Sequence, residues 1–156
     1  MTSSQSDREM RNYYEARAPV YDRVYQYPER QEDLRLLEAR VSASFSGCNV
    51  LEVAAGTGYW TQFIAQSAAR VLATDATQAA LDQVAARPPG AAAVTTCVAD
   101  AYELGALGHR FNAAFAGLWF SHSPRARWGE WLANLHDTLE DGALVVLMDN
   151  SQAQCE

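Results

Sequence analysis

Short apolar runs alternate with amphipathic segments along most of the chain. The runs predicted to form strands span residues 50–54, 71–74, 93–99, 112–117 and 143–148. Between them apolar residues recur three and four positions apart, most clearly over residues 126–139, which is the spacing of one helix face. Strands that alternate with helices indicate a parallel sheet with helices on both faces, so the pattern predicts a doubly wound α/β domain.

A helical pattern also precedes the first strand. It covers residues 7–45, where Pro19 and Pro28 break it into pieces, and its last part, residues 29–44, reads as one amphipathic helix. After the first strand the pattern predicts a helix at residues 59–68, and after the second strand it predicts a helix that Thr77 caps. We expect Asp141 and Gly142 to end the helix at residues 126–139.

The first strand and the turn after it, NVLEVAAGTGYWT at residues 49–61, carry the strongest candidate chemistry. The apolar run leads directly into Ala55, Gly56, Thr57 and Gly58, and then into a segment that can begin a helix. Glycines allow positive φ and close approach of a ligand, and the N–H groups at a helix start attract polar or anionic groups. This arrangement predicts a nucleotide-cofactor site.

Two classes of cofactor compete for this turn. A dinucleotide motif, G-x-G-x-x-G, needs a third glycine where Thr61 stands, although Asp75 has the spacing expected for a ribose contact. The other class is indicated by carboxylates at three strand ends: Glu52 lies inside the first strand, Asp75 closes the second, and Asp100 closes the third.

The stretch resembles class I S-adenosylmethionine-dependent methyltransferases of the small-molecule group, over residues 12–150. Their first motif is E/D-x-G-x-G-x-G, which corresponds here to Glu52, Ala54, Gly56 and Gly58, so Ala54 departs from the first glycine. The resemblance implies a Rossmann-like sheet of order 3-2-1-4-5. It also implies a helical cap, residues 1–45, on a cofactor-binding core, residues 46–156, in a single domain.

The resemblance further implies roles for individual residues. The glycine turn would hold the methionine part of the cofactor, Asp75 the two ribose hydroxyls, and Asp100 with Ala101 the adenine. The corresponding positions are Tyr14, Tyr21, Glu52, Ala54, Gly56, Thr57, Gly58, Trp60, Thr61, Asp75, Ala76, Asp100, Ala101, Ala116 and Gly117. The two tyrosines belong to the cap phrase YYEARAPVYDRVY; alternatively, their rings pack on the domain.

The segment after the fourth strand, GLWFSHSP, bears on the methyl acceptor. It lacks both the N/D-P-P-Y/F motif of enzymes that methylate base or glutamine amines and a Pro-Cys nucleophile. Both absences favour a small-molecule acceptor. His122 follows a central strand, where it would take a proton from the acceptor; alternatively, it caps the next helix or bonds a loop carbonyl.

The chain ends soon after the fifth predicted strand. The resembled family continues with two more strands, which we expect to be missing here. The apolar strand at 143–148 would then be an open sheet edge, which favours a homodimer through that edge. Alternatively, the N-terminal helices cover the edge, or the chain is a fragment.

Composition narrows the function further. With 156 residues, 49% of them hydrophobic, the chain suits one globular domain, and a net charge of −7 without a basic run argues against nucleic acid. Cys48, Cys97 and Cys155 are far apart and the histidines have no ligand spacing, so we expect no metal and a reduced, cytoplasmic compartment. No apolar run is long enough to span a membrane.

These observations predict S-adenosylmethionine-dependent methyl transfer to a small molecule. Two alternatives stay open, a nicotinamide-dependent oxidoreductase and a non-catalytic domain that binds the cofactor or a protein partner.

Overall fold

The computed structural model describes residues 8–9, 25–88 and 90–150. Tyr14 and Tyr21 lie outside these residues, as do residues 1–7 and 10–24 of the predicted cap, so the place of the two tyrosines at the site stays a prediction. None of the helices in the described part of the chain is both long and apolar enough to cross a membrane.

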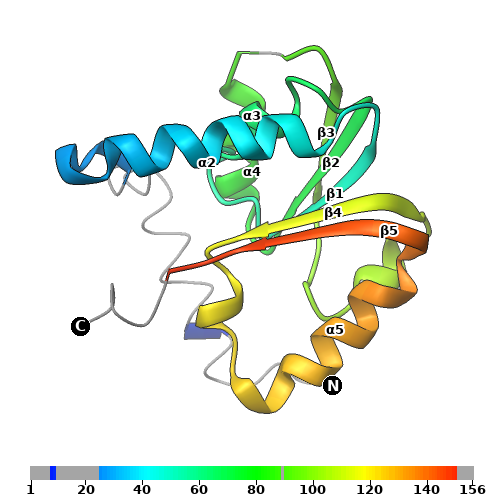
Figure 1. Cartoon of the computed structure of the whole chain (residues 1–156). Helices are drawn as coiled ribbons and strands as arrows, with labels where there is room; N and C mark the ends of the chain where they lie inside the picture. The colour runs from blue at the N-terminus through cyan, green and yellow to red at the C-terminus, as the bar shows by residue number, and fades with distance from the viewer. Residues whose placement is uncertain (1–7, 10–24, 89, 151–156) are drawn as a thin grey trace.

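Five parallel strands form one sheet in the order β3-β2-β1-β4-β5, which confirms the predicted order (Figure 1). They are β1 (Asn49–Val53), β2 (Arg70–Asp75), β3 (Ala93–Val98), β4 (Phe111–Gly117) and β5 (Leu139–Met148). β1 lies at the centre, where Val50 pairs with Val71 of β2 and Ala113 of β4. The carboxyl ends of all five strands therefore lie along one edge of the sheet.

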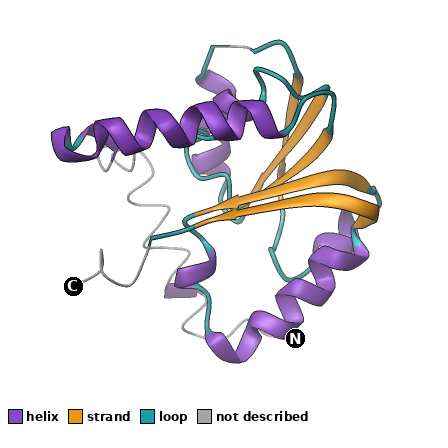
Figure 2. Ribbon diagram, viewed as in Figure 1, coloured by secondary structure: helices purple, strands orange, loops and turns teal. Residues whose placement is uncertain are grey.

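Helices cover the central strands on both faces (Figure 2). The α-helices are α2 (Gln31–Ser44), α3 (Thr61–Ile64), α4 (Gln78–Ala86) and α5 (Trp128–Asp137), and the short 3-10 helices are η2 (Pro28–Arg30), η3 (Leu104–Leu107), η4 (Phe120–His122) and η5 (Arg125–Arg127). Successive residues of a strand point to opposite faces of the sheet and pack into two hydrophobic cores, one on each face. Val50 and Phe115 pack with α2 and α3, whereas Leu51 and Ala114 pack with α5 and η3.

Both edge strands are more exposed than the strands between them. Every residue of β3 and β5 is at least partly accessible, and Val98, Leu144 and Leu147 are 50%, 41% and 43% exposed. The predicted open edge at the fifth strand is thus present in the described chain. Pairing of two chains along it stays a prediction, which sedimentation equilibrium over a wide concentration range tests.

Two predicted helix boundaries are wrong. The helix expected at 59–68 is only α3, because the chain must turn back into β2, where the N–H groups of Ala69 and Arg70 bond the Cys48 carbonyl. The helix expected at 126–139 ends at Asp137. Gly142, with φ of 76°, lies inside β5 where its register against β4 shifts, so this glycine forms a strand irregularity and not a helix end.

Candidate functional site

A cavity of about 200 Å³ lies at the carboxyl ends of the central strands. It brings together eleven of the predicted site residues: Glu52, Ala54, Gly56, Thr57, Trp60, Asp75, Ala76, Asp100, Ala101, Gly117 and His122. Three others lie elsewhere. Gly58 packs under α4, Thr61 bonds Glu52, and Ala116 is buried in the core beneath the cavity. Sequence distance between these residues reaches 70 positions, so strand order brings them together.

The glycines of the turn after β1 serve different purposes. Gly56 has φ of 57°, and a Cβ added there would meet no atom within 4 Å, so its backbone faces open space. Gly58 has φ of 83°, and a Cβ there would lie 2.9 Å from the Val84 side chain of α4. Gly56 therefore keeps the backbone approachable, whereas Gly58 lets the turn pack against α4.

Ala54 stands where the resembled motif has its first glycine. Its φ is 54°, in the left-handed region that costs an L-residue about 1 to 2 kcal/mol. Leu118 is in the same situation, with φ of 56° directly after β4. Both residues line the cavity, so strained backbone is concentrated at the site.

Glu52 is a buried carboxyl at the floor of the cavity. Its side chain is 1% exposed, and the Thr61 hydroxyl donates to its Oε2 at 2.5 Å. Burial raises the pKa of Glu52 from 4.5 to about 8; the Thr61 hydrogen bond opposes this, and the nearby Asp75 carboxylate adds to it. Glu52 is therefore mostly protonated at neutral pH, and a cation in the cavity would favour its ionised form.

Asp75 is the last residue of β2, and backbone groups hold its carboxylate. The N–H of Gly56 donates to Oδ2 at 2.9 Å, and the N–H of Thr77 donates to Oδ1 at 3.1 Å. Burial raises the pKa of Asp75, and these hydrogen bonds oppose the rise. A carboxylate has about four acceptor positions, so hydroxyl groups of a ligand can bind beside the two N–H donors.

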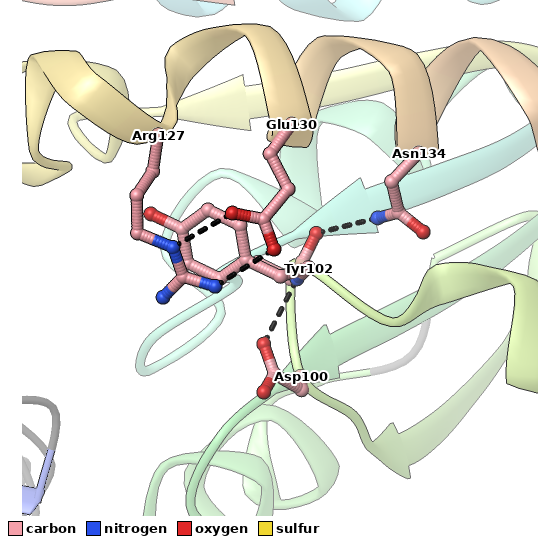
Figure 3. Close-up of polar contacts among 6 residues, drawn as sticks. Asp100, Tyr102, Arg127, Glu130 and Asn134 are labelled. Atoms are coloured by element: carbon pink, nitrogen blue, oxygen red, sulfur yellow. Dashed lines mark hydrogen bonds and ion pairs between the residues drawn. The ribbon is translucent and has the colours of Figure 1, made fainter. Parts of the chain in front are cut away.

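Asp100 lies two residues beyond β3 and completes a row of carboxyl groups. Its Oδ1 accepts the N–H of Tyr102 at 2.8 Å (Figure 3). Together, Glu52, Asp75 and Asp100 form what we call the carboxylate wall, which comes from three adjacent strands.

The opposite side, called the loop wall, consists of Leu118, Trp119, His122 and Arg127 after β4. Asp149, just after β5, fixes this segment by accepting the N–H of Ser121 at 2.7 Å and its hydroxyl at 2.6 Å. The adjacent His122 is exposed and lies at the cavity. Its role as the proton acceptor stays a prediction.

Several residues that line the cavity were missed by sequence reasoning. Tyr25 stacks on Tyr59 at 3.8 Å between ring centroids, and its hydroxyl accepts the indole N–H of Trp60 at 3.0 Å. The hydroxyl of Tyr59 donates to Glu38 of α2 at 2.5 Å, which ties the glycine turn to the N-terminal region. The tyrosine-rich segment was a signal for such contacts, but it did not distinguish Tyr25 from its neighbours.

No group of three His, Cys, Asp or Glu side chains in the described residues is arranged to hold a metal ion. The polar groups at the cavity include carboxyls, backbone N–H groups and hydroxyls, which suit an organic ligand with several hydroxyl groups, and the loop wall adds the His122 imidazole and the Arg127 guanidinium.

A doubly wound parallel sheet with a glycine turn after β1 and carboxylates at the next strand ends defines a nucleotide-cofactor fold. The family model of the methyltransferase domain matches residues 50–142, and the chain belongs to that family. This match confirms the resemblance to class I S-adenosylmethionine-dependent methyltransferases and favours that class over a nicotinamide-dependent enzyme.

Solved structures agree with this assignment. The DhpI–SAH complex is 26% identical with a TM-score of 0.73, and covers 92% of this chain and 68% of its own. The DhpI–SAM–HEP complex is 23% identical with a TM-score of 0.76, covering 99% and 71%. The N-methyltransferase NodS from Bradyrhizobium japonicum WM9 with S-adenosyl-L-homocysteine is 17% identical with a TM-score of 0.70, covering 87% and 70%. The curated proteins contain no significant match.

Proposed function

We propose that this chain binds S-adenosylmethionine in the cavity and transfers its methyl group to a small-molecule acceptor. The observation that carries the proposal is the carboxylate wall beside Gly56, where acceptor groups from three strands meet an open stretch of backbone. The complexes of DhpI and NodS with SAM or SAH support the same cofactor for this chain.

The residues present fit such a cofactor. Asp75 would accept hydrogen bonds from the two ribose hydroxyls, and the backbone at Gly56 would lie against the methionine part. Glu52, buried beneath the turn, would take its ionised form beside the cationic group of the ligand. The bound cofactor would supply an activated methyl group, so the protein's task is to hold the two reactants in line and to exclude water.

The loop wall would hold the acceptor. Trp119 and Arg127 line the cavity there, and His122 would accept a proton from a hydroxyl or amine acceptor as the methyl group is transferred. A small acceptor is supported by the size of the cavity and by the sequence after β4, which lacks the amine-positioning motif. One similar structure is a Haemonchus contortus phosphoethanolamine N-methyltransferase with phosphoethanolamine bound.

A calorimetric comparison of ligands tests the proposal. S-adenosylmethionine, S-adenosylhomocysteine and NAD are titrated into the protein in parallel, and the first two are expected to bind while NAD is not. Binding of NAD alone would contradict the proposal. Transfer of a labelled methyl group to any member of a panel of small alcohols, amines and thiols then distinguishes an enzyme from a domain that only binds the cofactor.

The remaining partner and location assignments are also proposals. The negative net charge supports an absence of nucleic-acid binding, which a gel-shift titration tests. The free thiols of Cys48 and Cys97 support a reducing compartment such as the cytoplasm, which fractionation of cells tests.

A further inference from the structure

The peptide group that joins Ala101 to Tyr102 is held at both of its polar atoms. Asn134 of α5 donates its side-chain amide to the Ala101 carbonyl at 2.8 Å, and the Tyr102 N–H donates to Asp100 at 2.8 Å (Figure 3). Because both ends are bonded, the peptide plane has little freedom to rotate. This peptide follows directly on the residue at the cavity wall, so its orientation constrains the backbone of Ala101.

The same side chain holds a second backbone group in this loop. The Asn134 Oδ1 accepts the N–H of Leu104 at 3.0 Å, so one amide spans two backbone positions three residues apart. Leu104 itself is fully buried and packs in the core beside Trp131 of α5. The loop from Asp100 to Leu104 is therefore fixed on the helix behind it.

Arg127, the residue directly before α5, also contacts a side chain of this loop. The guanidinium of Arg127 lies 3.6 Å from the centroid of the Tyr102 ring, and Glu130 accepts from two of its nitrogens at 2.9 Å each. Glu130 and Asn134 are four residues apart on one face of α5, and Arg127 stands directly before this helix. Figure 3 shows all three side chains turned toward the loop. The loop backbone is thus held by Asn134 of α5, and its aromatic ring is contacted by Arg127, which Glu130 of α5 holds in place.

The peptide bond before the held one carries the N–H of Ala101, a backbone donor next to the residue that Asn134 fixes. Within the described part of the chain this N–H pairs with no acceptor, and Ala101 lines the cavity. A backbone N–H can donate a hydrogen bond to the N1 atom of adenine, which is an acceptor. It cannot donate to N1 of hypoxanthine, because that atom carries a hydrogen. A site built around a fixed donor rejects a base that cannot accept from it.

We propose that Asn134 is a positioning residue that sets the selectivity of the cavity for adenine through the Ala101 backbone, without touching the ligand. This inference rests on the proposed function. Asn134 is not among the residues that line the cavity in the described part of the chain, so its influence on the base must pass through the loop from Asp100 to Leu104.

The test compares dissociation constants for S-adenosylhomocysteine and S-inosylhomocysteine, measured by calorimetry on the full chain. Asn134→Ala removes both hydrogen bonds, and Asn134→Asp keeps the acceptor for Leu104 but removes the donor to Ala101. We expect both variants to lower the preference for the adenine nucleoside by about tenfold, because the fixed donor is loosened. Asn112→Ala is the matched control: its side chain also bonds a backbone N–H, that of Asn49 at 2.8 Å, at the opposite end of the strands.

The expected result is a reduced ratio in the two Asn134 variants and a wild-type ratio in Asn112→Ala. An unchanged ratio, or an equal weakening of both ligands, in folded Asn134 variants would overturn the inference, since a purely structural role affects both ligands alike. If Asn134→Ala does not fold, Asn134→Asp decides. If the wild-type chain binds neither nucleoside, the proposed function itself fails, and this outcome is distinct from a wild type that binds with selectivity independent of Asn134.

Discussion

The two walls of the cavity are built by different means. On the carboxylate wall the acidic groups follow parallel strands and are held by nearby backbone, as Asp75 is held by the N–H groups of Gly56 and Thr77. On the loop wall, the positions of the residues depend on side chains that are distant in the sequence; for example, the Asp149 carboxylate accepts the N–H of Ser121. Strand pairing thus sets the first wall and tertiary contacts set the second. We expect changes in the first to alter cofactor affinity and changes in the second to alter methyl transfer.

The largest expected effect is on the carboxylate wall. Asp75→Ala should weaken binding of S-adenosylhomocysteine by about 2 to 4 kcal/mol, because the ribose hydroxyls lose a charged acceptor and the Gly56 N–H loses its partner. Calorimetry measures the effect. Asp82→Ala, at an exposed aspartate of α4, is the matched control and should bind as the wild type does. An unchanged dissociation constant in a folded Asp75 variant would refute the assignment.

A substitution in the loop wall should lower the rate of methyl transfer and leave cofactor affinity unchanged. His122→Gln should lower the rate of methyl transfer by about 100-fold, the lower end of the range for a general base, and leave the affinity for S-adenosylhomocysteine unchanged. The rate is measured with an acceptor from the panel at saturating cofactor, and His136→Gln serves as a control at an exposed helix position. A wild-type rate would remove His122 from the mechanism, whereas a loss of cofactor affinity would break the division between the walls.

The carboxylate wall could be predicted from the sequence because its geometry is local. Apolar runs predict the strands, and each carboxylate stands within or just beyond its own strand, so parallel order alone brings Asp75 and Asp100 to one edge. The predicted cap of α4 also depended only on nearby residues, and it is confirmed, because the Thr77 hydroxyl accepts the N–H of Ala80. Asp75 and Asp100 do line one cavity, and their roles toward a cofactor stay predictions.

The loop wall could not be predicted in the same detail. Arg127 of the loop wall stands directly before α5, and Asn134 lies within α5; the apolar face of this helix was recognised, but Arg127 and Asn134 contact a loop that lies about 25 to 30 positions earlier in the sequence. No spacing in the sequence identifies such a contact. The start of β5 was missed for a similar reason, since Leu139 continues an apolar helical pattern and only pairing with Phe111 makes it a strand residue.

A third prediction uses the buried acid of the carboxylate wall. The folded chain binds a proton at Glu52 more tightly than the unfolded chain, since its pKa is raised from 4.5 to about 8. Between these values the unfolded state releases the proton first, so the free energy of unfolding falls as pH rises and levels off above about pH 8. Asp75, whose pKa is also raised, contributes in the same direction.

Glu52→Gln should therefore reduce the loss of stability between pH 5 and pH 8 by on the order of 2 kcal/mol. Urea unfolding at several pH values measures this. Glu140→Gln, at an exposed position of β5, should keep the wild-type pH dependence. If Glu52→Gln loses stability with pH as steeply as the wild type, burial of this carboxyl does not govern the pH response.

The smallest expected effect concerns backbone strain at two residues that line the cavity. Ala54 and Leu118 are each the first residue after a central strand, and each has a positive φ although neither is glycine. Ala54→Gly should stabilise the chain by about 0.5 to 1 kcal/mol, because relief of about 1 to 2 kcal/mol of backbone strain exceeds the added entropy of the unfolded chain. Ala55→Gly, one residue later and without a positive φ, should have the opposite sign, since no strain is relieved, the entropy cost remains, and a methyl group that packs against Leu81 and Val84 is lost. Urea unfolding of both variants decides, and destabilisation by Ala54→Gly would show that the left-handed backbone there is not strained. Leu118→Gly would also remove a large side chain from the cavity wall, so Ala54→Gly isolates the effect of backbone strain more cleanly. Unaltered cofactor affinity in Ala54→Gly would show that the strain at this turn does not contribute to ligand binding.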